Sequence, residues 1–101
     1  MNDEEIVSGF EASKKTSSKG GEYWTARTMQ SLLGYDDWRN FQNVMERAAT
    51  SGKSVGIELS HHFVGFTNMI ETGKGARREY DDFYLSRFAC YLIAMNGDPS
   101  K

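Results

Sequence analysis

The longest apolar run of the chain lies close to its end, between Phe88 and Met95, and it contains no charged residue. Eight residues are too few to cross a bilayer, and a helix that is apolar on every side must be covered by other elements. Ser86 is a suitable N-cap for such a helix, and Asn96-Gly97 is a typical end signal. The pattern therefore predicts a central core helix against which the rest of the chain packs.

A short strand and then a helix are predicted before Gly34. Tyr23 and Trp24 follow a Gly-Gly turn, which favours a strand. Thr25 suits the N-cap of a helix over residues 26–33, and Gly34 suits its C-terminal end. The apolar residues of this helix recur at helical spacing, so one stripe of it should face the core.

A longer helix is predicted next, capped by Asp36 or Asp37 and closed by Ser51-Gly52-Lys53. Its apolar residues, at three-to-four spacing, are Trp38, Phe41, Val44, Met45, Ala48 and Ala49. Its opposite face carries Arg39, Asn40, Asn43, Glu46, Arg47 and Thr50. The two helices outline a helix-turn-helix, in which outward side chains of these types reach phosphates and base edges. The candidate nucleic-acid contacts are Arg39, Asn40, Asn43 and Arg47; an ordinary helix pair with a solvated polar face is the alternative.

A β-hairpin is predicted from strands over residues 67–71 and 79–85, joined by a turn with glycines at 73 and 75. The cations at its tip are Lys74, Arg77 and Arg78. A basic hairpin tip resembles the wing of a winged helix, and three cations near one glycine turn indicate contact with an anion such as DNA phosphate. The alternative is an exposed loop kept soluble by charge, because acidic residues flank it at Glu71, Glu79, Asp81 and Asp82.

The N-terminal segment is acidic and poor in apolar residues, so residues 1–9 are predicted to be a flexible arm before a single domain over 10–101. Ser8 and Glu11 have the spacing of a capping box, which predicts a short helix through about Lys15. Residues 16–21 are polar and end in two glycines, as expected for a mobile loop.

These elements predict an α+β fold, in which a helix-turn-helix-like pair and a wing-like β-hairpin pack on the C-terminal apolar helix. The large side chains expected in the core are Trp24, Trp38, Phe41, Phe88, Leu92 and Ile93.

Composition narrows the function classes. The chain has 101 residues, 39% of them apolar, which suffices for one domain with its own core. Twelve basic and 14 acidic residues give a net charge of −2, so nucleic acid would be attracted only by a local basic patch. The single cysteine, Cys90, excludes an internal disulfide, and neither a secretory nor a transmembrane segment is evident. We expect a cytoplasmic protein without membrane association.

No motif typical of an enzyme or a cofactor site is present in the sequence. His61-His62 lacks further ligands at metal-site spacing, and Gly73-x-Gly75 is too short for a phosphate-binding fingerprint. Cys90, the one thiol that a histidine could activate, lies in the apolar run and is expected to be buried. We therefore expect no catalysis, no cofactor and no metal.

Several stretches resemble, in the same order, the bacterial DNA-damage-inducible protein D family. They are Tyr23-Trp24-Thr25-Ala26-Arg27, Leu32-Leu33-Gly34-Tyr35, Asp37-Trp38-Arg39-Asn40-Phe41, Ala48 with Ser51-Gly52, His62-Phe63, Gly73-x-Gly75-Ala76-x-Arg78, and Leu85 through Pro99. The N-terminal half of those proteins is similar to the BRO-N domain of phage antirepressors and large-virus proteins. Residues 12–19 depart from the family in being rich in lysine and serine. Family members also continue beyond the position of Lys101, so the resemblance implies the N-terminal part of a longer protein.

The resemblance implies a role in the bacterial DNA-damage (SOS) response, with modulation of a recombinase filament on single-stranded DNA as the family's proposed activity. Two hypotheses follow. In the first, which we favour slightly, the chain is a DNA-binding module for single- or double-stranded DNA. In the second, it is an antirepressor-like interaction module whose basic tip meets an acidic patch on a recombinase or a repressor. The sequence does not set an oligomeric state.

Overall fold

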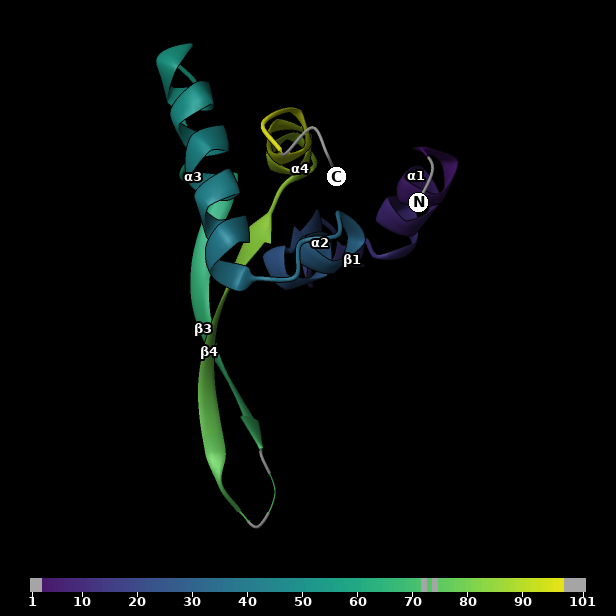
Figure 1. The fold of residues 1–101 in the computed structure, drawn as a ribbon, viewed down its shortest axis with the longest axis vertical. Helices are drawn as coiled ribbons and strands as arrows, with labels where there is room; N and C mark the ends of the chain where they lie inside the picture. The colour runs from purple at the N-terminus through teal and green to yellow at the C-terminus, as the bar shows by residue number, and fades with distance from the viewer. Residues whose placement is uncertain (1–2, 72, 74, 98–101) are drawn as a thin grey trace.

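The computed structural model describes residues 3–71, 73 and 75–97. Within these residues the elements are, in order, α1 (Asp3–Ala12), β1 (Lys15–Thr16), β2 (Glu22–Thr25), α2 (Ala26–Leu32), α3 (Trp38–Ser54), β3 (Phe63–Glu71), β4 (Arg77–Leu85) and α4 (Arg87–Met95). The strands form one antiparallel sheet in the order β1-β2-β4-β3 (Figure 1). The predicted α+β class is confirmed.

The longest strands, β3 and β4, pair with each other over their full lengths, from Phe63↔Leu85 to Glu71↔Arg77. By contrast, β2 meets β4 at Trp24↔Leu85 and Thr25↔Tyr84, beside the base of the hairpin. The outer part of the hairpin therefore extends away from the helices as a two-stranded projection, which we call the hairpin arm (residues 67–71 and 77–81; Figure 1). The predicted hairpin is confirmed, with longer strands than expected, while Lys74 lies outside the described residues.

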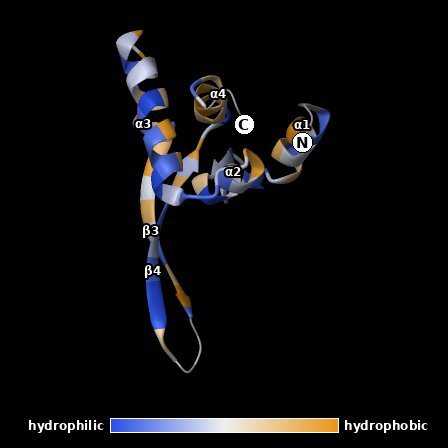
Figure 2. Cartoon of the chain, viewed as in Figure 1, coloured by the Kyte–Doolittle hydropathy of each residue, from blue (hydrophilic) through white to orange (hydrophobic). Residues whose placement is uncertain are grey.

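The core lies between one face of the sheet and the helices, and Trp24 is at its centre. This side chain is fully buried, stacks on Phe10 with ring centroids 4.3 Å apart, and donates from Nε1 to the Phe10 carbonyl at 2.8 Å. Phe41, Leu85 and Ile93 are the next largest fully buried side chains. Colouring by hydropathy shows the contrast between the largely hydrophobic α4 and the hydrophilic outer part of β4 (Figure 2).

The helix starts follow the sequence signals closely. The side chains of Thr25, Asp37 and Ser86 accept hydrogen bonds from backbone N–H groups in the first turns of α2, α3 and α4. Each cap satisfies one of the N–H donors that a helix start leaves unpaired. Gly34 follows α2 with a φ of 82°, a left-handed conformation that favours glycine. These predictions are confirmed because capping is decided by neighbours in sequence.

Two predicted boundaries are wrong, and the predicted end of α3 at Ser51-Gly52-Lys53 is one residue short. Helix α1 begins at Asp3, so Ser8 lies inside it and does not start it. Thr16 belongs to β1, which pairs with β2, and not to a loop. Gly52 does not end α3, which continues to Ser54; instead it is a close-approach position, where a Cβ atom would lie 3.1 Å from Leu59. The division into a flexible arm over 1–9 and a domain over 10–101 stays a prediction.

Helix α4 is covered on one side only, which corrects the prediction of a helix wrapped all round. Ala89, Cys90, Leu92 and Ile93 are buried, whereas Tyr91 and Met95 are 50% and 73% exposed. The two predicted core residues that are only partly buried are Trp38 and Phe88. An uncharged run predicts that a helix forms, but it does not predict how many sides of that helix the fold covers.

Candidate nucleic-acid interface

The polar stripe of α3 is exposed along its length. Arg39, Asn40, Asn43 and Arg47 all face solvent, while Phe41, Val44, Met45 and Ala48 on the other side are buried. A shallow groove of about 460 Å³ runs over the stripe, lined by Asn43, Glu46, Arg47 and Thr50. The structure thus brings together the four candidate contacts predicted on this helix, and Glu46 lies among them.

The hairpin arginines lie apart from each other. Arg77 stands opposite Glu71 and Arg78 opposite Ile70 in the register of β3 and β4. Because successive residues of a strand project to opposite faces, the two guanidinium groups do not form one cluster. Both side chains are exposed, and within the described part of the chain neither takes part in an ion pair.

A hollow of about 610 Å³ connects the arm with the start of α3. Its lining includes Trp38 and Gln42 from α3 and Arg78 and Tyr80 from β4, with Arg27 of α2 between them. The side chain of Arg78 therefore faces the same hollow as the first turns of α3. Arg77, on the other face of the strand, is not among the lining residues.

Arg27 fixes the orientation of the arm relative to α2 and α3. Its guanidinium carbon lies 3.7 Å from the ring centroid of Trp38 and 5.7 Å from that of Tyr80. Its Nε donates to the Asp81 carbonyl and its backbone N–H to the Asp82 carboxylate, both at 3.0 Å. A cation over an aromatic face is attracted by the ring quadrupole, so these contacts hold helix and hairpin together.

Asp82 is buried, which corrects its interpretation as one of the solvated acids that flank the basic tip. Its side chain is shielded by the fold, with the residue 4% exposed, and Oδ1 accepts from the N–H groups of Arg27 and Phe83 at 3.0 and 2.8 Å. A buried carboxylate is stabilised when several N–H groups point at it. The base of the arm is therefore held by a polar contact that no local sequence signal predicts.

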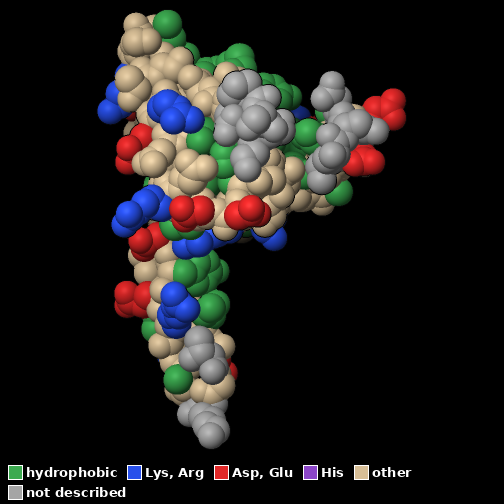
Figure 3. All heavy atoms as spheres, in the orientation of Figure 1, with side chains coloured by type: hydrophobic (Ala, Val, Ile, Leu, Met, Phe, Trp, Pro, Cys, Tyr) green, Lys and Arg blue, Asp and Glu red, His purple; other side chains and the backbone are tan. Residues whose placement is uncertain are grey.

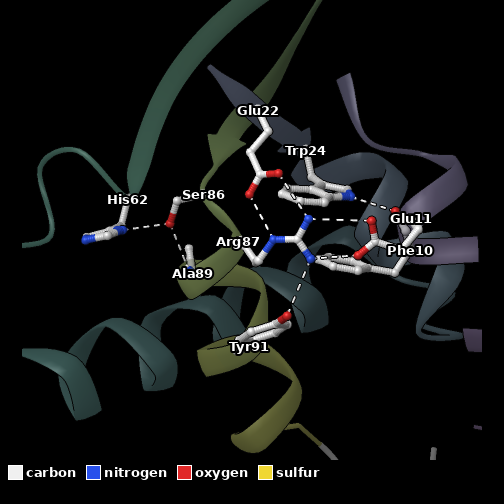
Figure 4. A network of polar contacts seen from close by, with 9 residues as sticks. All are labelled: Phe10, Glu11, Glu22, Trp24, His62, Ser86, Arg87, Ala89 and Tyr91. Atoms are coloured by element: carbon white, nitrogen blue, oxygen red, sulfur yellow. Dashed lines mark hydrogen bonds and ion pairs between the residues drawn. The ribbon is translucent and has the colours of Figure 1, made fainter. Parts of the chain in front are cut away.

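A second cluster, centred on Arg87, joins α1, β2 and α4 (Figure 4). Its guanidinium donates to Glu22 at 2.8 and 3.0 Å and to Glu11 at 2.6 Å, and lies 5.0 Å from the ring centroid of Trp24. Hydrogen bonding to Arg87 lowers the pKa of both glutamates and raises the pKa of the guanidinium. Since Arg87 is engaged by both carboxylates, we assign the cluster to holding the fold and not to ligand binding.

The remaining candidate groups for chemistry also have structural roles. His62 Nδ1 lies 2.7 Å from Ser86 Oγ, which caps α4 by accepting from the Ala89 N–H (Figure 4). Burial raises the pKa of the Cys90 thiol to about 12, so it stays protonated at neutral pH. Among the described residues, His, Cys, Asp and Glu side chains do not gather in threes as a metal site requires.

The visible surface carries both signs of charge. Basic groups are spaced along α3 and the hairpin, with acidic groups between them and on α1 (Figure 3). Such a surface binds a polyanion through local contacts and not through a broad positive field. In the part of the chain that is described, no helix combines the length and apolar character needed to span a bilayer.

Comparison with known proteins places this geometry in a family. The model of the BRO family, N-terminal domain, matches residues 14–101. DNA damage-inducible protein D of Escherichia coli (strain K12) is 40% identical over 92 residues, which make up 91% of this chain and 34% of that protein. The chain therefore spans about a third of the length of this relative. No solved structure matches it. On the family match, which begins after α1 and includes both α3 and the hairpin, the chain belongs to the BRO family as its N-terminal domain.

Proposed function

We propose that this domain is a non-enzymatic module that binds duplex DNA through the outer face of α3, within a bacterial, cytoplasmic response to DNA damage. The observation that carries the proposal is the exposed stripe of Arg39, Asn40, Asn43 and Arg47 on a helix of 17 residues. The major groove admits an α-helix, and arginine and asparagine side chains match the donor and acceptor pattern of base edges.

In this proposal the hairpin arm contacts the phosphate backbone of the DNA. Arg77 and Arg78 lie at its outer end, and Lys74 lies between β3 and β4 in the sequence. Lysine and arginine contacts to phosphates position a protein on DNA without reading sequence. The contacts of Arg27 with Trp38 and Tyr80 keep α3 and the arm in a fixed relation, so both can meet one duplex.

The link to DNA damage comes from similarity. The relative from Escherichia coli carries the name DNA damage-inducible protein D, and the matched region covers most of this chain. The matched region is 34% of that protein, so the activity of the whole protein is not carried over to this chain. The proposal is therefore confined to a binding role for the domain.

The test is fluorescence anisotropy of a labelled duplex titrated with the domain at several salt concentrations. Each phosphate contact contributes about 0.9 to the slope of log affinity against log salt, so Arg39→Ala with Arg47→Ala should lower the slope by about 1.8 if both arginines contact phosphates. A matched control, Lys14→Ala with Lys19→Ala, removes the same charge from the segment around β1. Unchanged affinity and slope in the α3 variant, or an equal loss in the control, would rule out this face.

A second function is favoured by the apolar side chains of the arm. Met69 and Ile70 are 47% and 46% exposed beside the two arginines, a combination that suits a protein partner with an acidic, partly apolar patch. The partner class implied by the resemblance is a recombinase or a repressor. Co-elution of the domain with a purified recombinase in the absence of DNA, lost in Met69→Ser with Ile70→Ser, is expected; separate elution of the folded domain would count against it.

A further inference from the structure

The sheet has a second face, opposite the core, on which aromatic side chains are exposed or partly exposed. Along β2 the buried Trp24 is flanked by Tyr23 and Thr25, and along β4 the buried Leu85 is preceded by Tyr84. Alternation along a strand places Tyr23 and Tyr84 on the face away from the core, and the register adds Phe66 of β3 to it. The solvated face of a sheet usually carries polar residues, so a row of aromatic rings on this face is unusual and indicates a binding surface.

The rings are arranged as one continuous surface, which we call the aromatic face (Tyr23, Phe66, Tyr80 and Tyr84). Phe66 and Tyr84 stack with centroids 4.1 Å apart and planes 15° apart. Tyr23 meets Tyr84 edge-on at 5.2 Å. Tyr80 continues the row toward the arm, where its hydroxyl accepts from Asn68 Nδ2 at 3.1 Å. Tyr84 is 40% exposed and the other three rings are partly buried, so Tyr84 is the ring of the row most open to a ligand.

Two hollows flank the row and share Tyr23 and Tyr84 as a wall. One, of about 440 Å³, is bounded by Ser17, Ser18 and Gly21 in the loop before β2. The other, of about 460 Å³, extends along the strands to Phe66 and Tyr80. A flat ring of a ligand has space on either side of the tyrosine pair.

The charges beside the second hollow favour an anion. Lys15 stands opposite Tyr23 in the β1–β2 register, and Arg27 borders the same hollow. The carboxylate of Asp82 also lines it but is buried and already accepts two N–H groups. Glu22, beside the first hollow, is bound to Arg87. Lys15 is thus left available to a ligand, and Arg27 adds positive charge at the border of the hollow while its guanidinium stays over Trp38 and its Nε donates to the Asp81 carbonyl.

A flexible anionic chain that presents flat rings fits both features. Every base has a face that stacks on an aromatic side chain, while duplex DNA keeps its bases stacked inside. One known RNA-binding module stacks two or three bases of a single strand on aromatic side chains of a four-stranded sheet in this way. We propose that single-stranded DNA lies across the aromatic face, with bases stacked on Tyr84, Phe66 and Tyr23 and phosphates near Lys15 and Arg27. The stacking residues Tyr23, Phe66 and Tyr84 lie on the sheet face away from the core, and the duplex contacts proposed on α3 are not among them, although Arg27 and Tyr80 border both this hollow and the one beside α3.

The experiment measures anisotropy of a labelled oligothymidylate with the full chain. Tyr84→Leu with Phe66→Leu keeps apolar bulk in the strands but removes the stacking surface, and should weaken binding by on the order of tenfold or more. Tyr84→Phe keeps a ring and should bind like the wild type, which separates loss of stacking from loss of fold. Tyr91→Leu, at an exposed tyrosine of α4 away from this face, is the matched control and should not change affinity.

The competing outcomes are distinct. Arg39→Ala with Arg47→Ala should leave single-strand binding intact, whether or not the wild type binds duplex, so the two sites can fail separately. The aromatic face is overturned if the double leucine variant binds single strands as tightly as the wild type. It is also overturned if Tyr91→Leu loses as much affinity, or if an oligouridylate or a duplex displaces the oligothymidylate more effectively than unlabelled oligothymidylate does.

Discussion

The body of the molecule, which comprises the helices, β1, β2 and the bases of β3 and β4, differs from the hairpin arm in how many of its side chains are buried. In the body, Trp24, Phe41 and Ile93 have no measurable exposure, and the Arg87 cluster ties three elements together. In the arm, apart from the contacts of Arg27 with Tyr80 and Asp81, the two strands pair only with each other, and Met69 and Ile70 are nearly half exposed. A two-stranded hairpin is marginal by itself in water, so the arm depends on the contacts at its base. The difference teaches that stability resides in the body, while the arm keeps its side chains exposed to solvent.

Truncating the core should have the largest effect. Trp24→Ala removes a buried ring, its stack on Phe10 and a hydrogen bond, and should lower the free energy of unfolding by about 3–5 kcal/mol. Ile70→Ala in the arm should cost less than about 0.5 kcal/mol, because exposed positions tolerate truncation. Urea unfolding followed by circular dichroism measures both. Equal losses at the two sites would refute the contrast between body and arm.

Removing the buried carboxylate at the base of the arm should have an intermediate effect on stability. Asp82→Ala leaves two N–H groups, those of Arg27 and Phe83, without their acceptor, and should destabilise by about 1–3 kcal/mol. Asp81→Ala is the matched control at the exposed neighbouring acid. Thermal unfolding of the two variants gives the comparison, and a control that loses as much as Asp82→Ala would show that burial of this carboxylate does not matter.

Acidification should have the smallest effect, and only on the body. The folded pKa values of Glu11 and Glu22 are lowered from 4.5 by hydrogen bonds from Arg87. Their contribution is therefore complete above about pH 4.5 and is lost as the pH falls through the lower folded values. Glu11→Gln with Glu22→Gln should flatten the pH dependence of the unfolding midpoint in this acidic range. The same change at Glu46 and Glu79 should leave the wild-type profile, and a flattening there instead would contradict the assignment.

Local features of the fold could be predicted from the sequence, and contacts between distant segments could not. Capping by Thr25, Asp37 and Ser86 involves side chains and N–H groups two or three residues apart, so it is visible in the sequence. Arg87 meets partners 65 and 76 residues away, and Arg27 meets Asp82 across 55 residues. Such contacts form only when the chain has folded, so the sequence alone does not show them.

The candidate sites show the same division. The stripe on α3 follows from helical periodicity, and its exposure agrees with the prediction. The aromatic face was missed because residues 63–66 were not assigned to a strand. The sequence therefore did not predict on which side of the sheet Phe66 lies, or that Tyr23 and Tyr84 lie side by side on paired strands. Alternation of Tyr23 with the buried Trp24 was the available signal.

The most direct test is amide hydrogen exchange of the chain, free and with DNA that has both a duplex and a single-stranded part. In the free chain, amides of the arm (residues 67–71 and 77–81) should exchange faster than those of α4, since local opening is easiest where few apolar contacts exist. Adding DNA should slow exchange in the arm and leave α4 unchanged. Equal protection of arm and α4 in the free chain, or no slowing in the arm with DNA, would contradict the account in which the body supplies stability and the arm meets nucleic acid.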